Sequence, residues 1–502
     1  MKPTLAAART RQVSVHIARV LSPVMLAVLA AAGAPAMADG TTFFIPGNLV
    51  VSVEGNGVMG ATSGSYTDNQ AAPLSLFQFQ LSGTSSASYV NSLVLPQTSS
   101  GSNFVVSGEY GSSSEGSLQL SGNGQYLTIA GYGVNAAAFN ANPGAYSPNS
   151  SNTALGQSGS MTGQSYTAVP RVVALIDSNG SVNSSTALYN VFNANNPRSV
   201  YSADGTSVYV SGQGTSGDAT GGVFYSAVGA ATTAPTSITG ADAGSGASQD
   251  TRFVTAYNGQ LYVSVDSKSG ATNRSFIGSL GSSGTLPTSV ANGANGPAQL
   301  TGFGATNGLY TITSTNGNTL NAAGQKINLS PANYLFANAT TLYVADTGAP
   351  KNSKGNTSSV GDGGLQKWSL VNGSWTLDYT LSVGLNLVAN GSAAGTTGLL
   401  GLTGQQVMVN GVAEEELFAT NYTVGDTDAT YLYGITDVLG ATTAQGGEQF
   451  TQLAAAPADS NFKGVSFAPT TLAAAVPEPA PFALFAAGLV GVGVIVRRKR
   501  VN

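Results

Sequence analysis

The chain has 502 residues and a formal net charge of −5, and it contains one histidine, His16, and no cysteine. These counts exclude a Ser-His-Asp triad, a Cys-His pair and the common zinc and copper sites from any segment without His16, because each needs imidazole or thiolate. They also exclude disulfides, so a packed core must stabilise the fold, and roughly 430 residues between the chain ends are enough for one large domain or two smaller ones.

The first 38 residues have the organisation of a secretory signal peptide. A basic region, an apolar core and a small-x-small cleavage site follow one another: Lys2, Arg9, Arg11 and Arg19, then residues 20–34, then Ala36-Met37-Ala38. The apolar core is short and the cleavage site follows at once, which favours removal over retention as a signal anchor. We therefore expect export and a mature chain that begins at Asp39. Since His16 lies in this segment, the mature chain has neither histidine nor cysteine.

The body, residues 39–470, is predicted to be all-β. It is rich in Gly, Ser, Thr and Asn, and it has no long stretch of helical periodicity. Short alternations of β-branched and aromatic residues recur instead, each entered from a Gly or Asn turn. The expected strands are 48–53, 73–79, 123–130, 204–211, 222–226, 258–265, 307–312, 338–346, 364–370, 375–381, 416–422, 430–435 and 462–469.

A turn followed by Leu-Tyr-Val, or a close variant, repeats along the body. Its tyrosines are 126, 209, 262, 310 and 343, separated by 83, 53, 48 and 33 residues, and we expect the first step to span two units. Units of about 40 to 50 residues are typical of propeller blades. We predict a β-propeller of about seven blades, six or eight being allowed, whose first and last strands share a blade and leave no open edge. A β-helix or a pair of β-sandwiches is the alternative.

One stretch of the body is similar to a known repeat. Residues 342–348, Leu-Tyr-Val-Ala-Asp-Thr-Gly, resemble the strand signature of NHL-type repeats, and the body as a whole resembles the tyrosine-rich propellers of secreted bacterial proteins. The full signature occurs only once. The resemblance implies a propeller fold and assigns no activity.

Catalysis by the mature chain would depend on carboxylates. The candidates are Asp346, Asp362, Glu414, Glu415, Glu416, Asp426 and Asp428. Two carboxylates at a suitable separation would serve a glycoside hydrolase, but no pattern fixes such a pair. An acidic residue in a Gly-rich turn more often caps that turn, and the run 414–416 predicts a solvated loop. We assign no catalytic residue.

Metal and ligand signals are equally sparse. Asp426-Thr427-Asp428 matches the first two ligands of a calcium loop but lacks the Gly and the terminal Glu of an EF-hand. We assign no metal site and no cofactor. Trp368 and Trp375 lie on adjacent predicted strands, where we expect a cross-strand core pair. A sugar-stacking platform is the alternative.

The last 27 residues are organised as an anchor. A Val476-Pro477-Glu478-Pro479 turn precedes an apolar run, residues 482–496, and a basic end, Arg497, Arg498, Lys499 and Arg500. As a helix the run satisfies its own backbone in lipid, and the cations keep the C-terminus cytoplasmic. Its 15 residues are fewer than the roughly 20 that span a bilayer core, so snorkelling, thinning or neighbouring helices must compensate.

This order of parts resembles the PEP-CTERM sorting signal of Gram-negative envelopes. The resemblance covers only residues 476–502. It implies that an exosortase-type enzyme recognises the Pro-Glu-Pro motif, cuts there and delivers the body to the cell surface or matrix. An ordinary single-pass tail is the alternative.

The charge of the remaining chain bears on its partners. The two basic segments hold eight of the 18 Lys and Arg, which leaves 10 against 23 acidic residues and a charge of −13. Nucleic acid needs a basic stripe, so we expect no such partner. We expect an exported, non-enzymatic structural or binding propeller of the cell surface or a biofilm matrix. Its partners would be the export machinery, an exosortase, and exopolysaccharide or other surface proteins. A carboxylate-dependent glycan-active enzyme is the alternative.

The two end signals predict the mass and location of the protein recovered from its own cells. Sorting gives a mass that lacks residues 1–38 and the residues after the Pro-Glu-Pro motif, in a surface or medium fraction. Intact-mass spectrometry of each fraction measures this. A membrane-bound form that keeps Arg497 to Arg500 contradicts it and identifies a plain single-pass anchor.

Overall fold

The computed structural model describes residues 42–215, 217–240, 250–267, 274–292, 296–303, 309–313, 322–349 and 363–471. The expected all-β class is confirmed in this part of the chain. The described helices are α2 (Ala136–Ala141) and two 3-10 turns, η1 (Pro143–Tyr146) and η2 (Leu155–Gln157). None of them is long and apolar enough to cross a membrane. The predicted signal peptide, Asp362, the Pro-Glu-Pro motif, the apolar run and the basic end all lie outside the described residues.

The described strands, apart from the two-residue-wide exceptions of single bridges, form six sheets. The large sheet has ten strands: β1 (Leu49–Gly55), β2 (Ala71–Ser82), β3 (Ser86–Val94), β4 (Ser107–Glu109), β5 (Gln119–Leu120), β6 (Tyr126–Tyr132), β7 (Arg171–Asp177), β8 (Val182–Leu188), β12 (Ala231–Thr232) and β28 (Ser460–Phe467). Only the short β12 pairs in parallel, with β8. The other pairs of this sheet are antiparallel.

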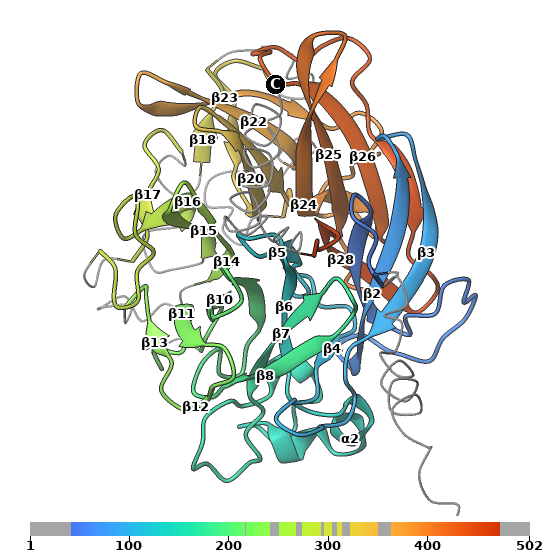
Figure 1. Ribbon diagram of the computed structural model, residues 1–502, viewed down its shortest axis with the longest axis vertical. Coiled ribbons are helices and arrows are strands. Elements are labelled where there is room, and N and C mark those ends of the chain that lie inside the picture. The colour runs from blue at the N-terminus through green and yellow to red at the C-terminus, as the bar shows by residue number, and fades with distance from the viewer. Residues whose placement is uncertain are drawn as a thin grey trace, which may run out of the picture. The chain divides into compact units, whose positions relative to one another are not determined.

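Four antiparallel sheets of four strands follow in chain order (Figure 1). They are β9 (Pro197–Tyr201), β10 (Ser207–Gly212), β11 (Gly222–Ala227) and β13 (Thr236–Ser237); β14 (Thr251–Tyr257), β15 (Gln260–Ser267), β16 (Arg274–Leu280) and β17 (Ala298–Gln299); β20 (Pro331–Asn338), β21 (Thr341–Asp346), β22 (Gly364–Val371) and β23 (Ser374–Leu381); and β24 (Thr396–Val409), β25 (Val412–Thr423), β26 (Tyr431–Val438) and β27 (Thr451–Ala455). A two-stranded pair, β18 (Leu309–Thr311) with β19 (Lys326–Asn328), lies between the second and third of them in sequence.

The first and last described strands share the large sheet, as expected. β1 pairs antiparallel with β28, from Leu49 opposite Phe467 to Gly55 opposite Ser460. On its other edge β1 pairs with β2, so all seven of its residues are buried. The two ends of the body are therefore joined by backbone hydrogen bonds.

The opening strands of the sheets are neighbours. β9 lies beside β6 and β14, β14 beside β20, β20 beside β24, and β24 beside β28. The same order is visible around the centre of Figure 1, where β14, β20, β24, β28 and β5 are labelled. Each sheet thus contributes its first strand to a common interior.

The long step between Tyr126 and Tyr209 was expected to span two units, and this is wrong. Tyr126 is in β6 and Tyr209 in β10, and their sheets are neighbours through β6 and β9. Residues 133–170 instead form loops, α2 and the 3-10 turns. These pack Phe139 and Leu155, both fully buried, against Tyr132. The step is long because it holds an insertion rather than a further sheet.

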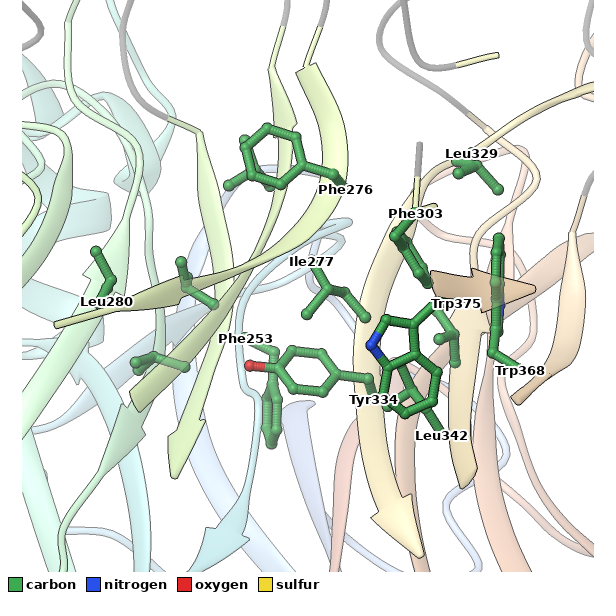
Figure 2. Close-up of a cluster of buried hydrophobic side chains, with 14 of the residues drawn as sticks. Phe253, Phe276, Ile277, Leu280, Phe303, Leu329, Tyr334, Leu342, Trp368 and Trp375 are labelled. Carbon is green, nitrogen blue, oxygen red and sulfur yellow. The ribbon is translucent and has the colours of Figure 1, made fainter. Parts of the chain in front are cut away.

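The largest apolar cluster lies between the sheets from β9 to β23 (Figure 2). Both tryptophans belong to it, which confirms their expected place in the core. They are not directly opposed, however, because the register pairs Trp368 with Leu377 and Trp375 with Leu370. The Trp368 ring lies 4.2 Å from that of Phe303. The sugar-stacking alternative is therefore wrong for Trp368, which is fully buried.

Replacing Trp368 should measure this packing. Trp368→Ala is expected to lower the free energy of unfolding by about 3–5 kcal/mol, since it removes a large side chain from a close-packed site. Met408→Ala is the control: Met408 is 66% exposed and should change stability by less than about 0.5 kcal/mol. Urea unfolding of both variants decides, and a loss under about 1 kcal/mol for Trp368→Ala would contradict the described packing.

Candidate functional site

A recess of about 230 Å³ opens among the inner strands β5, β14, β20, β24 and β28. Five aromatic side chains contribute to its wall: Phe253, Tyr257, Tyr334, Phe336 and Phe467. Strand alternation places them there, because residues two apart on a strand face the same side. Phe253, Thr255 and Tyr257 of β14 follow this spacing, as do Tyr334 and Phe336 of β20.

Two of these aromatic rings are stacked. The Tyr257 and Phe336 rings have centroids 4.9 Å apart and planes inclined by 18°, and both side chains are half-buried. Drug-sized ligands occupy pockets of about 300–1,000 Å³, so this recess suits a smaller group, such as one sugar ring or one side chain. The hydroxyls of Thr255, Thr403 and Ser466 are the polar groups beside the rings. The recess can therefore bind by stacking and hydrogen bonding.

A cluster of buried charges lies next to the recess. It surrounds a cavity of about 20 Å³ lined by Glu115, Arg198, Arg252 and Lys463, and Phe253 lines both spaces. A cavity of this size holds about one water molecule and no sugar. Gly401 of β24 permits the close approach here, since a Cβ on it would lie 2.7 Å from the Lys463 carbonyl oxygen.

Ion pairs neutralise much of this cluster. Arg198 Nη2 lies 3.0 Å from Asp250 Oδ1, and Arg252 Nη2 lies 3.0 Å from Asp266 Oδ2. Lys463 Nζ lies 3.8 Å from Glu54 Oε2. All six side chains are buried. The cationic groups that line the cavity are thus already matched by carboxylates of the same chain.

Three further acids have strongly perturbed protonation. Burial raises the pKa of Glu54, Glu109 and Glu115 above the usual value. The negative charge of Glu115 raises the pKa of the other two further. Hydrogen bonds from the Tyr132 hydroxyl and the Asn196 amide partly oppose this effect at Glu115. Sequence reasoning missed these acids, because nothing in the Ser- and Gly-rich stretch around Glu109 and Glu115 signals burial.

Arg171 holds the adjoining loops together. Its Nη1 donates to Val169 O (2.9 Å), and its Nη2 donates to Ser158 O (2.8 Å), Phe192 O (2.8 Å) and Asn195 O (2.9 Å). The guanidinium also lies 4.7 Å from the centre of the Tyr132 ring. The side chain is 1% exposed. This is a structural cation that fastens the insertion after β6 to β7.

The predicted carboxylates are scattered. Asp346 is fully buried at the end of β21 and caps a turn, with Oδ1 accepting from Gly348 N at 2.9 Å, as expected for an acid in a Gly turn. Asp428 Oδ2 accepts from Gly395 N and Gly425 N, both at 2.9 Å, and Asp426 is exposed. Within the described ranges, no three carboxylates lie close enough to hold a metal ion.

The expected loop at Glu414–Glu416 is wrong. These residues lie inside β25, and strand alternation turns Glu415 inward while Glu416 accepts a hydrogen bond from Gln405 Nε2 at 2.9 Å. Glu415 is 3% exposed and lies opposite Asp437 of β26. Burial, followed by the charge of Asp437, raises its pKa to about 7. A run of three acids conceals the alternation that buries its middle member.

No protein-family model and no curated protein matches this chain. The interpretation of the site therefore rests on its own geometry.

Arg171→Lys should destabilise the protein. Lysine has three donors without the planar fork of arginine, so at least two buried carbonyl oxygens lose their partner, at about 1–3 kcal/mol each. We expect a loss of about 3 kcal/mol or more in urea unfolding. Lys326→Ala, at an exposed position of β19, is the control and should change stability by less than about 0.5 kcal/mol. Equal stability of the two variants would refute the fastening role.

Proposed function

We propose that this chain is an exported, non-enzymatic β-propeller that binds a component of the cell surface or extracellular matrix through the aromatic recess. The observation that carries the proposal is the separation of the aromatic rings from the acids. The recess is lined by rings and hydroxyls, while Glu54, Glu109 and Glu115 are buried around a space too small for a sugar. A glycoside hydrolase needs two carboxylates beside the bound sugar.

The propeller itself is part of the proposal. The order of neighbours among β6, β9, β14, β20, β24 and β28, together with the pairing of β28 with β1, supports a ring of sheets closed by the two ends of the body. We propose six blades, the lower value of the range expected from the sequence. The large sheet supplies two of them, and the direct contact between β14 and β20 leaves no inner position for β18 and β19.

Export and sorting rest on the two end segments. The signal peptide and the PEP-CTERM-like tail support passage through the export machinery, a single-pass membrane precursor and release by an exosortase-type enzyme. A protein delivered in this way meets exopolysaccharide and other surface proteins. Between these two, the stacked rings and neighbouring hydroxyls favour a sugar, whose C–H face packs on an aromatic ring while its hydroxyls form hydrogen bonds.

Binding of matrix polysaccharide tests the proposal. Purified mature protein should bind polysaccharide from the producing cells and change its tryptophan emission, because the Phe336 ring lies 6.0 Å from that of Trp375. Tyr257→Ala should weaken binding at least about tenfold, since stacking contacts are worth about 1 kcal/mol or more. Thr403→Phe, which fills the recess, should abolish it. Calorimetry gives the affinities.

The matched control is Tyr89→Ala, which removes an aromatic residue that is 40% exposed on β3, away from the recess. It should bind like the unmodified protein. Equal weakening by Tyr89→Ala and Tyr257→Ala would contradict the assignment of the recess. New reducing ends after incubation with the polysaccharide would favour the glycan-active enzyme instead.

A further inference from the structure

A buried lysine and a buried aspartate from different sheets are in direct contact. Lys367 is on β22 and Asp437 on β26, and their side chains are 1% and 0% exposed. Lys367 Nζ lies 2.6 Å from Asp437 Oδ2. It also donates to Val438 O at 2.7 Å and to the Tyr379 hydroxyl at 3.0 Å. β22 and β26 lie in adjacent regions of Figure 1.

Two tyrosine hydroxyls hold the carboxyl group of Asp437. Tyr379 donates to Oδ1 at 2.6 Å, and Tyr343 donates to Oδ2. The Lys367 ammonium lies 5.3 Å from the centre of the Tyr379 ring and 5.5 Å from that of Tyr343. Around the pair lies an apolar cluster that includes Leu365, Leu417 and Ile435. In such surroundings a charged pair is costly, and transfer of the proton to give neutral amine and neutral acid becomes favourable.

Glu415 adds a proton-relaying group. It lies opposite Asp437 across β25 and β26, and its Oε2 is buried without a hydrogen-bond partner. Its pKa of about 7 lets it exchange a proton near neutral pH. Asp378 and Glu448 also face the pair electrostatically, and burial raises the pKa of both. Ser369 and backbone N–H groups, however, already donate hydrogen bonds to these two acids.

We propose that Lys367 and Asp437 condense to an intramolecular amide bond, with Glu415 relaying the proton. The Lys367 ammonium first gives a proton to the Asp437 carboxylate through Glu415. The Nζ lone pair then attacks Asp437 Cγ, and the hydroxyls of Tyr379 and Tyr343 stabilise the charge that develops on the oxygens. Glu415 takes the second proton from nitrogen and delivers it to the departing oxygen. The Cγ–O bond breaks, the Cγ–Nζ bond remains, and one water leaves. Atoms and charge balance without any oxidant or added reactant.

The chain contains a natural comparison. Lys463 and Glu54 are also buried, but their Nζ and Oε2 atoms are 3.8 Å apart. The Glu54 carboxylate oxygens accept no hydrogen bond, so no donor polarises that carboxyl group. Attack requires reacting atoms about 3–3.5 Å apart. We therefore expect the bond at Lys367 and not at Lys463.

Mass spectrometry of the full protein tests the bond. The intact mass should be lower than that of the same chain unlinked by one water. Trypsin should not cut after Lys367. Digestion with trypsin and a Glu-specific protease should leave residues 355–414 joined to residues 417–448, because Glu414 to Glu416 lie between the two linked residues. A mass without this loss, or a bond mapped to Lys463 and Glu54, overturns the proposal.

Variants separate the roles of the residues. Lys367→Met and Glu415→Gln should both restore the unlinked mass, and circular dichroism establishes that each is folded. Glu416→Gln is the matched control, since Glu416 lies next to Glu415 but bonds to Gln405 instead. It should keep the bond in full. Persistence of the bond in Glu415→Gln removes Glu415 from the mechanism, and its loss in Glu416→Gln would assign the effect to strand β25 as a whole.

Discussion

The antiparallel pairing of β1 with β28 is the constraint on which the interior depends. β1 carries Glu54 and β28 carries Lys463, so the same ladder that joins the ends of the body also brings this acid and this base together. β28 in turn lies beside β24, where Gly401 allows the Lys463 backbone to approach. Without the pairing, the large sheet would end in two open edges, and open edges invite pairing with other chains. The recess would also lose Phe467 from its wall.

Charge is handled inside this protein in an unusual way for a chain with so few charged residues. Arg171 is satisfied almost wholly by carbonyl oxygens, while Arg198 and Arg252 are satisfied by carboxylates. Buried ion pairs give little net stability, because desolvation offsets their attraction, but removing one partner is costly. These groups therefore act mainly to fix one arrangement of loops and strands. With the acids matched internally, the neighbouring recess is left to rings and hydroxyls.

The parts that the sequence could predict are those set by local alternation. The strands around Tyr209, Tyr262 and Tyr343 follow from their period-two patterns, and the joined ends follow from strands at both limits of the body. The insertion after β6 could not be predicted, because Phe139 and Leu155 become core residues only through contact with Tyr132. The buried acids were missed for the same reason. Burial of Glu415 requires Lys367 and Asp437, which lie 48 and 22 positions away in the sequence, to converge on it from other strands.

Covalent linkage of Lys367 to Asp437 would have a clear physical consequence for a chain that has no disulfide. The two residues are 70 positions apart, and in the chain-entropy treatment a cross-link that closes a loop of this size stabilises a fold by about 4 kcal/mol. It would also replace a buried ion pair, which contributes little net stability, with a neutral amide. The link joins β22 to β26, so it would resist separation of two neighbouring sheets that are otherwise held by side-chain packing. An exported protein gains most from such a bond, because unfolding outside the cell exposes it to proteolysis and is rarely reversed.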